Sequence, residues 1–520
     1  MKMKKGYKII AVLCAIIVSA TSLTACSNST SQRKDVKGKK EIRLSYWMSG
    51  LGEEWLNNMI AAFEEENPKY YVTVTSSANA SSLTSAFGMA DLDETDIYIN
   101  LKNEAIEFME PLDSLLETTA KGDEKILREK FNSNYLAYEK SADGHYYTLT
   151  SGGGMIGLYY NKTLFDKAGV TQLPRTTDEL TVLCDTLNSE GIKPLCHFKN
   201  GGYYNSLLKV YVAQYDGMDY YLNKLWACID DAGKSPSKAV LTNKDGRYYA
   251  LKAMEKFITP TYTMAGSVTQ SHTEIQTQFV QEKAAMMVNG SWIENEMKVN
   301  EGDSKIGVMK VPVLSAITSQ LTTVKTDSAL RKVITAIDQV EAGEKQLSDF
   351  ASGEDYVVGG ATVSAADWNK VAEARSVIPS NYAEQSVFIP NYSDVKEGAI
   401  KFLEYWYSDA GYKIFTEATK CPLPMELSNG QSIDAAKMSK AQQAQFDWIS
   451  ADTLFADGGY SQKHEIYLTG GAGIMNIEYA GKFCASNATD RMTADEVWKL
   501  WEKTVDDNYE NNWLPNMKER

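Results

Sequence analysis

The stretch FVQEKAAMMVNGSW, which runs from Phe279 to Trp292, predicts three consecutive features of the fold. It reads as the end of a helix, a buried strand built on two methionines and a valine, and a turn that delivers a tryptophan. A core strand that ends on a turn carrying the largest aromatic side chain leaves two interpretations for Trp292. The ring either packs in a core or faces a bound molecule, and the choice between these interpretations requires the rest of the sequence.

Upstream, the chain follows a strand–helix–strand pattern that is typical of a parallel sheet. The helix has apolar side chains every four residues on one face, and a proline follows it. A further short strand, DIYIN, ends at Asn100. The expected elements are a strand at 41–47, a helix at 53–66, a strand at 70–75 and a strand at 96–100. This order predicts a doubly wound α/β domain.

Ligands of open α/β sheets bind beyond the carboxyl ends of the strands. In this chain, that rule selects Trp47 and Ser49 after the first strand and Asn100 after a later one. Each has an ordinary structural alternative, since Trp47 suits a core and Asn commonly caps a helix.

A second type of pattern begins at Asp143, where two extended segments meet at the triple glycine 152–154. Consecutive glycines permit unusual dihedral angles, so this is either a hinge between lobes or a plain loop. Ser151 lies on the expected crossing strand. In KNGGYYN, the loop residues Tyr203 and Tyr204 are candidates for lining a cleft, or alternatively for covering a helix end.

The remainder of the chain is helix-rich. Residues 207–300 read as mostly helical, residues 326–350 as a charged helix, and residues 396–416 as a long amphipathic helix. Two segments read as strands, KIGVMKVPVL at 305–314 and VVGGATVS at 357–364.

The chain has 520 residues, which predicts at least two domains. The net charge of −15 argues against a nucleic-acid partner, because phosphate contacts require a basic surface. The 30 tyrosines and 10 tryptophans supply many rings for cores and wet binding surfaces.

The first 25 residues have the organisation of a secretory signal, with four lysines, an apolar run and a small-residue region. Leu23-Thr24-Ala25-Cys26 ends this region and resembles a bacterial lipoprotein signal, which implies that Cys26 is lipidated. The alternative is ordinary cleavage beside a chance cysteine. Residues 26–40 are polar and read as a flexible tether.

Motifs of metal and nucleophile chemistry do not stand out. The four histidines have no zinc spacing, and there is no GxSxG. We therefore expect no catalytic residue, no metal and no cofactor, although carboxylates are too numerous for counting to exclude a glycosidase pair. Cys184 and Cys196 either pair in an oxidising compartment or remain buried thiols.

Four stretches together resemble the extracellular solute-binding proteins of carbohydrate-type ABC transporters, solute-binding family 1. They are YW with EEENPKYYVTV, DGHYYTLT with GLYYNKTLFDKAGV and LPRTTDEL, FVQEKAAMMVNGSW with KIGVMKVPVL, and EGAIKFLEYWYSDAGYKIFTEATKCPLP. The resemblance implies an α/β, two-lobed, periplasmic-binding-protein-like fold with crossing hinge strands. With it, we expect lobe 1 at 41–150 and 315–422, and a helix-rich lobe 2 at 151–314 and 423–520. The resemblance also raises the possibility that residues 315–358 are an insertion.

The resemblance also implies a function. A lipid-anchored protein on the extracellular face of the membrane would capture a sugar or oligosaccharide between its lobes and deliver it to the permease subunits of an ABC transporter, acting as a monomer. In similar proteins a GSW-type turn carries a ring that stacks on the sugar, which favours the binding interpretation of Trp292. The alternatives are a surface carbohydrate-active enzyme, and the same fold binding a non-sugar solute or serving a sensor.

Overall fold

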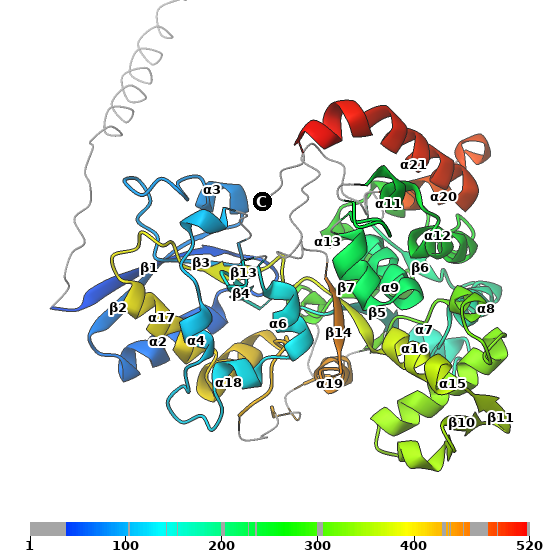
Figure 1. The fold of residues 1–520 in the computed structure, drawn as a ribbon, viewed down its shortest axis with the longest axis horizontal. Helices are drawn as coiled ribbons and strands as arrows, with labels where there is room; N and C mark the ends of the chain where they lie inside the picture. Colours follow the sequence, from blue (N-terminus) through cyan, green and yellow to red (C-terminus); the bar gives the residue numbers. More distant parts are fainter. Residues whose placement is uncertain are drawn as a thin grey trace, which may run out of the picture.

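The computed structural model describes residues 38–516, except for 102–104, 142, 153, 199–202, 227, 235–236, 299–304, 429–432, 435, 437, 451, 458–476 and 486. The signal segment, Cys26 and most of the predicted tether lie outside these residues. The described chain forms two lobes side by side, each with its own sheet and its own hydrophobic core (Figure 1).

Lobe 1 is built on a five-stranded sheet in the order β2-β1-β3-β13-β4. Its first three strands run parallel, whereas β13 is antiparallel to both of its neighbours. The strands are β1 (Lys40–Trp47), β2 (Tyr70–Ser77), β3 (Ile97–Ile99), β4 (Leu149–Thr150) and β13 (Ser386–Phe388), and the helices are α2 (Glu54–Glu66), α3 (Ala80–Leu83), α4 (Asp113–Leu116), α5 (Leu127–Lys130), α6 (Ser133–Glu139), α17 (Lys396–Trp406) and α18 (Asp409–Thr419).

Aromatic side chains from distant segments fill the core of lobe 1. Trp55 on α2 is fully buried, and its ring centroid lies 4.7 Å from that of Trp406 and 5.1 Å from that of Phe415. Such pairs contribute about 0.5–1.5 kcal/mol each beyond the area they bury. They hold α17 and α18, which come late in the sequence, against the first helix of the lobe.

Lobe 2 contains a four-stranded sheet in the order β6-β7-β5-β8, in which β5 is antiparallel to β7 and β8. The five residues of β7 are all buried, and they are the strand predicted after Phe279. The strands are β5 (Ile156–Asn161), β6 (Leu195–Cys196), β7 (Met286–Gly290) and β8 (Ile306–Met309), and the helices are α7 (Lys162–Lys167), α8 (Thr177–Ser189), α9 (Tyr204–Asp216), α10 (Met218–Tyr220), α11 (Lys238–Thr242), α12 (Gly246–Phe257), α13 (His272–Val280), α14 (Ile293–Glu296), α19 (Lys440–Asp447), α20 (Ala480–Phe483) and α21 (Ala494–Asn508).

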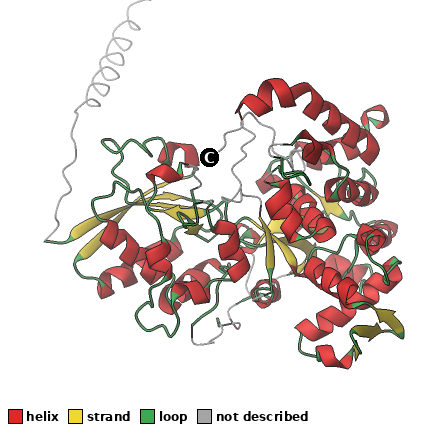
Figure 2. Cartoon of the chain, viewed as in Figure 1, coloured by secondary structure: helices red, strands yellow, loops and turns green. Residues whose placement is uncertain are grey.

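A two-stranded parallel sheet of β12 (Val377–Ser380) and β14 (Leu454–Asp457) lies between the lobes (Figures 1 and 2). Because side chains alternate along a strand, its two faces serve different cores. Val377 and Ala456 belong to the core of lobe 2, whereas Ile378 and Phe455 belong to the core of lobe 1. This ribbon and the segment between β4 and β5 form the hinge region.

Residues 315–376 pack on lobe 2, which differs from their predicted place in lobe 1. They form α15 (Asp327–Glu341), β9 (Ala351–Ser352), β10 (Asp355–Val358), β11 (Ala361–Val363) and α16 (Ala365–Ser376) around a small core of their own. Arg175, just before α8, donates a hydrogen bond to Thr335 at 2.7 Å, and Arg331 forms an ion pair with Glu179 at 3.1 Å. These contacts attach α15 to lobe 2, and lobe 1 resumes near Ile378.

The segment predicted as one strand at 357–364 is a hairpin instead. β10 and β11 pair antiparallel around Gly359 and Gly360, which have φ angles of 56° and 79°. Two adjacent residues with positive φ make the tight turn that suits a two-residue hairpin. The two glycines therefore end one strand and begin the next.

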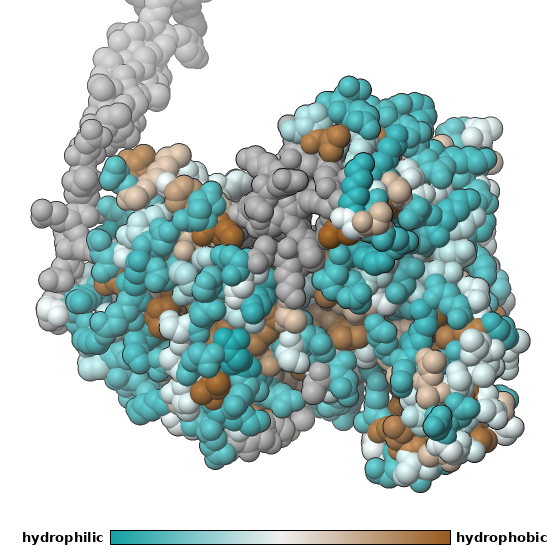
Figure 3. Space-filling view, viewed as in Figure 1, coloured by the Kyte–Doolittle hydropathy of each residue, from teal (hydrophilic) through white to brown (hydrophobic). Residues whose placement is uncertain are grey.

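The visible surface of both lobes is predominantly hydrophilic, with scattered hydrophobic positions (Figure 3). Within the described part of the chain, no helix combines the length and the apolar character needed to cross a bilayer.

Candidate functional site

The lobe 1 candidates meet around the side chain of Asn100. The side-chain nitrogen of Asn100, Nδ2, donates hydrogen bonds to the Trp47 carbonyl and to Ser49 Oγ, both at 3.2 Å. Asn100 Oδ1 accepts a hydrogen bond from Ser151 Oγ at 2.6 Å. Asn100 follows β3 with a φ of 60°, a left-handed conformation that asparagine tolerates better than most residues. Four residues predicted separately are thus neighbours at the carboxyl edge of the parallel strands.

The members of this group differ in exposure. Asn100 and Ser151 are buried, so they organise the group, whereas Trp47 and Ser49 are partly exposed. The indole nitrogen of Trp47 donates to the Ala78 carbonyl at 3.2 Å, which fixes the ring beside the end of β2. Trp47 and Ser49 are therefore the two that can contact a molecule from outside.

The crossing segment after Ser151 is held to the second crossing by the Asn381 side chain. The Gly154 backbone donates to Asn381 Oδ1 at 2.7 Å, and the Asn381 backbone donates to the Gly154 carbonyl at 3.1 Å. Gly152 has a φ of 120°, and a Cβ there would lie 2.3 Å from the Phe415 ring. The residues at this crossing are fixed by steric fit as well as by hydrogen bonds.

Trp292 follows β7 and lies in a slot made by two glycines. A Cβ on Gly290 would lie 2.2 Å from the indole, and one on Gly154 would lie 3.1 Å from it. The side chain is only 5% exposed. This placement differs from the open stacking ring expected from the sequence, because the missing Cβ atoms let the indole settle into the lobe 2 core at the hinge.

The two tyrosines of KNGGYYN, at the start of α9, differ in exposure and in the surface that they face. Tyr203 is partly exposed, and its ring centroid lies 5.7 Å from Trp292 and 5.6 Å from His272. Tyr204 is 1% exposed and packs inside lobe 2 against His197. Successive helical residues point about 100° apart, so one ring faces the hinge side while the other fills the core.

The lobes touch where α14 meets the loop after β1. The Asn295 amide nitrogen of lobe 2 donates to the Gly50 carbonyl of lobe 1 at 2.8 Å. The neighbouring Glu296 accepts a hydrogen bond from Gln276 at 2.6 Å and lies against Gly50. The sequence prediction missed Asn295 and Glu296. The one available signal was their position three and four residues after Trp292, which returns them to the same side of a helix.

The model of the bacterial extracellular solute-binding protein family matches residues 49–326, slightly more than half of the chain. This chain belongs to that family. The matched region begins at Ser49 in the loop after β1 and includes Ser49, Asn100, Ser151 and the α14 contact, whereas Trp47 lies just before it.

Two curated relatives of this solute-binding protein align over part of its length. The multiple sugar-binding protein of Streptococcus mutans is 24% identical over 313 residues, which cover 59% of this chain and 70% of the relative. A binding protein of Brucella abortus is 27% identical over 203 residues, which cover 39% of this chain. The chain spans only 44% of that protein's length.

Solved structures with the same fold cover nearly the whole chain. A bacterial solute receptor described as preferring β-D-galactopyranose has a TM-score of 0.58 at 12% identity, with coverage of 90% of this chain and 99% of the receptor. A chitin oligosaccharide-binding protein has a TM-score of 0.57 at 14% identity, with 91% and 99% coverage. The predicted two-lobed α/β fold is confirmed, and both family and fold are those of binding proteins.

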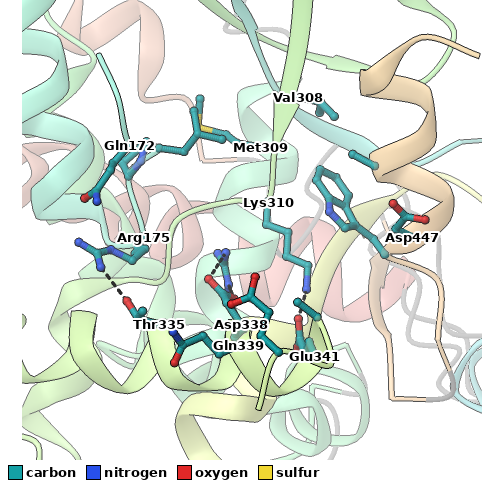
Figure 4. Close-up of a pocket in the computed structure, with 17 residues that line it drawn as sticks. Gln172, Arg175, Val308, Met309, Lys310, Thr335, Asp338, Gln339, Glu341 and Asp447 are labelled. Carbon is teal, nitrogen blue, oxygen red and sulfur yellow. Dashed lines mark hydrogen bonds and ion pairs between the residues drawn. The ribbon is translucent and has the colours of Figure 1, made fainter. Parts of the chain in front are cut away.

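A separate groove of about 950 Å³ lies between α15, the end of β8 and α19 (Figure 4). Two ion pairs lie within it. Lys310 pairs with Glu341 at 2.7 Å, and Arg375 pairs with Asp338 at 2.8 Å. None of the predicted site residues lines this groove.

The cysteines of the described chain are free and buried, including Cys184 on α8 and Cys196 on β6. Burial raises the pKa of both thiols, so they behave as small apolar side chains. The suggested pairing is not formed, and the buried-thiol alternative describes these positions.

Proposed function

We propose that this protein captures a sugar or oligosaccharide between its two lobes. The observation that carries the proposal is the convergence of Trp47, Ser49, Asn100 and Ser151 at the strand ends of lobe 1, facing the side of lobe 2 that bears Tyr203 and α14. Aromatic rings stack on the apolar faces of a sugar, and hydroxyl and amide groups bond its rim. The names of the relatives that bind sugars support the same class of ligand.

The roles within this site follow from exposure. Trp47 supplies the stacking ring of lobe 1 and Tyr203 the ring of lobe 2, because both are partly exposed. Ser49 is the hydroxyl that reaches the ligand. Asn100 and Ser151 position the loop, and Trp292 and Tyr204 support the lobe 2 wall from inside.

A ligand that contacts both lobes binds the closed arrangement best, so it shifts the population toward closure by its differential affinity. Bending at the hinge then converts occupancy into a change of shape. Such a change is what a permease partner would recognise, and we propose delivery to an ABC transporter permease as the second half of the function.

We also propose that Cys26 carries the lipid that anchors the protein to the extracellular face of the membrane. Multiple acyl chains give stable anchoring where a single chain does not. Metabolic labelling with a palmitate analogue tests this directly. The wild type should incorporate label and sediment with membranes, whereas label retained by Cys26→Ser would show another site.

A thermal-shift screen against mono- and oligosaccharides tests the ligand class. A ligand of the native state should raise the unfolding midpoint with dose, because it stabilises only the form that it binds. Analysis of the same mixtures for cleaved glycans separates binding from catalysis. A dose-dependent shift with intact glycan supports the proposal, whereas product formation or the absence of any sugar-dependent shift contradicts it.

A further inference from the structure

The contact between α14 and Gly50 has a specific steric requirement. A Cβ at position 50 would lie 2.6 Å from Glu296 Oε1, closer than real Cβ contacts allow, and 3.0 Å from its Cδ. Glycine at this position lets the Glu296 carboxylate rest on the backbone of lobe 1. The contact joins segments 246 residues apart in the chain, and the Asn295–Gly50 hydrogen bond lies next to it.

The Glu296 carboxylate receives little compensation in this position. Gln276 donates to Oε2 at 2.6 Å, and within the described ranges no lysine, arginine or histidine pairs with Glu296. Burial raises the pKa of the carboxyl, and the Gln276 hydrogen bond lowers it in part. Glu296 is partly exposed in this arrangement, and a carboxylate that loses hydration without gaining a cation is costly unless hydrogen-bond donors replace the lost water.

The described titratable groups that interact around Glu296 do not supply a positive charge. His272 lies one turn before Gln276 on the same face of α13, and burial lowers its pKa, which favours the neutral ring. Among the described residues, the Tyr203 phenol interacts with Glu296 and with the carboxylate of Glu384, and all three groups are acids. Cys421, whose pKa burial raises, interacts electrostatically with Glu296 as well.

These observations have a consequence for lobe closure. Moving α14 onto Gly50 removes water from a carboxylate that nothing in the described protein neutralises. A ligand rich in hydroxyl donors offsets that cost, and a ligand without donors does not. We propose that Glu296 makes lobe closure depend on hydrogen-bond donors of the ligand, with Gly50 as its contact point on lobe 1. This inference rests on the proposed capture of a solute between the lobes and names the chemistry that the same site demands.

The interlobe distance measured by single-molecule fluorescence transfer tests the inference without any ligand. Donor and acceptor dyes are attached at two exposed positions, Ser85→Cys, which follows α3 of lobe 1, and Thr273→Cys on α13 of lobe 2. The helices α3 and α13 lie on facing sides of the two lobes (Figure 1). The cysteines of the described chain are buried, and Cys26→Ser in the chain from residue 26 leaves only the introduced thiols to react.

Glu296→Gln keeps the shape and the acceptor for Gln276 while it removes the charge. We expect it to at least double the closed fraction in the absence of ligand, whereas the matched control Glu344→Gln, an exposed carboxylate beyond α15, should leave the fraction unchanged. Gly50→Ala should act in the opposite direction and reduce the closed fraction. An unchanged distribution in Glu296→Gln, with its thermal midpoint within a few degrees of wild type, overturns the inference.

A titration with hydroxyl-rich oligosaccharides forms the second arm. Glu296→Gln should weaken the binding of a glycan that shifts the wild type, because one charged acceptor is lost. Unchanged glycan affinity in this variant also contradicts the inference but leaves sugar capture intact. Failure of every glycan to bind the wild type contradicts the proposed function, and the ligand-free distributions then still decide the role of Glu296.

Discussion

Asn100 and Ser151 are joined by two hydrogen bonds that connect the end of β3 to the hinge. Ser151 Oγ donates to Asn100 Oδ1 at 2.6 Å, and the Asn100 backbone donates to Ser151 Oγ at 3.0 Å. The same hydroxyl lies 2.9 Å from the Gln385 carbonyl on the second crossing. The loop that carries Trp47 and Ser49 is thereby tied to both crossings, so ligand contact and lobe movement share one network.

Removal of this hydroxyl should destabilise the protein. Ser151→Ala leaves the buried Asn100 N–H and Oδ1 without their shared partner, and the loss of such a partner costs about 1–3 kcal/mol. We expect the free energy of unfolding in urea to fall by about 1–3 kcal/mol. Ser49→Ala is the control, because Ser49 is partly exposed and water can replace its bond. An equal loss in both variants would contradict the special role of Ser151.

Trp47→Ala should weaken ligand binding without a matching loss of stability. The ring is partly exposed, so its removal opens no deep cavity. Stacking contributes about 0.5–1.5 kcal/mol, so its loss should raise the dissociation constant measured by calorimetric titration about two- to twelve-fold. An unchanged dissociation constant would show that the Trp47 ring does not contact the ligand.

Trp292→Ala should behave in the opposite way. The indole is buried against Gly154 and Gly290, so its loss leaves a cavity that costs about 3–5 kcal/mol. Chemical denaturation should show this loss, and Trp292→Phe should recover part of it. A variant that keeps wild-type stability and loses only affinity would instead restore the stacking role expected from the sequence.

The elements of lobe 1 follow closely from the sequence. The apolar positions of the first helix predict its buried face, and Trp55, Met59 and Phe63 are all buried in α2. The rule that ligands lie at strand carboxyl ends selects Trp47, Ser49 and Asn100, which the structure brings together. These inferences succeed because they depend on local periodicity and on a general property of parallel sheets.

Other features depend on contacts between distant segments and could not be predicted. The amphipathic pattern of α15 predicts that one face is buried, but it does not predict which lobe covers that face. The contacts of α15 with Arg175 and Glu179 place it on lobe 2. The slot for Trp292 requires Gly154, which comes from the crossing segment between β4 and β5, more than 130 residues earlier. The exposure of an aromatic ring is set by such neighbours and not by the turn that carries it.

Asp216 at the end of α9 should make stability depend on pH. Burial, followed by the nearby Asp245 carboxylate, raises its pKa to about 7, while Gly246 donates to it at 2.7 Å. A raised carboxyl pKa means that the folded protein binds more protons than the unfolded chain between about pH 4 and pH 7. This contribution is therefore fully present below pH 4 and is lost as the pH rises through 7.

Asp216→Asn should remove that dependence. The amide oxygen can still accept from Gly246, so we expect stability at pH 8 to rise by on the order of 1 kcal/mol and its slope between pH 5 and pH 8 to flatten. Urea unfolding at several pH values measures both quantities. A slope identical to that of wild type would show that Asp216 is ionised in the folded protein throughout this range.

The interlobe distance at saturating glycan tests the central claim most directly. With dyes at Ser85→Cys and Thr273→Cys, a saccharide identified by thermal shift should move the population to the closed distance with one-to-one saturation. A glycan that saturates the protein while the distance distribution stays unchanged would contradict capture between the lobes.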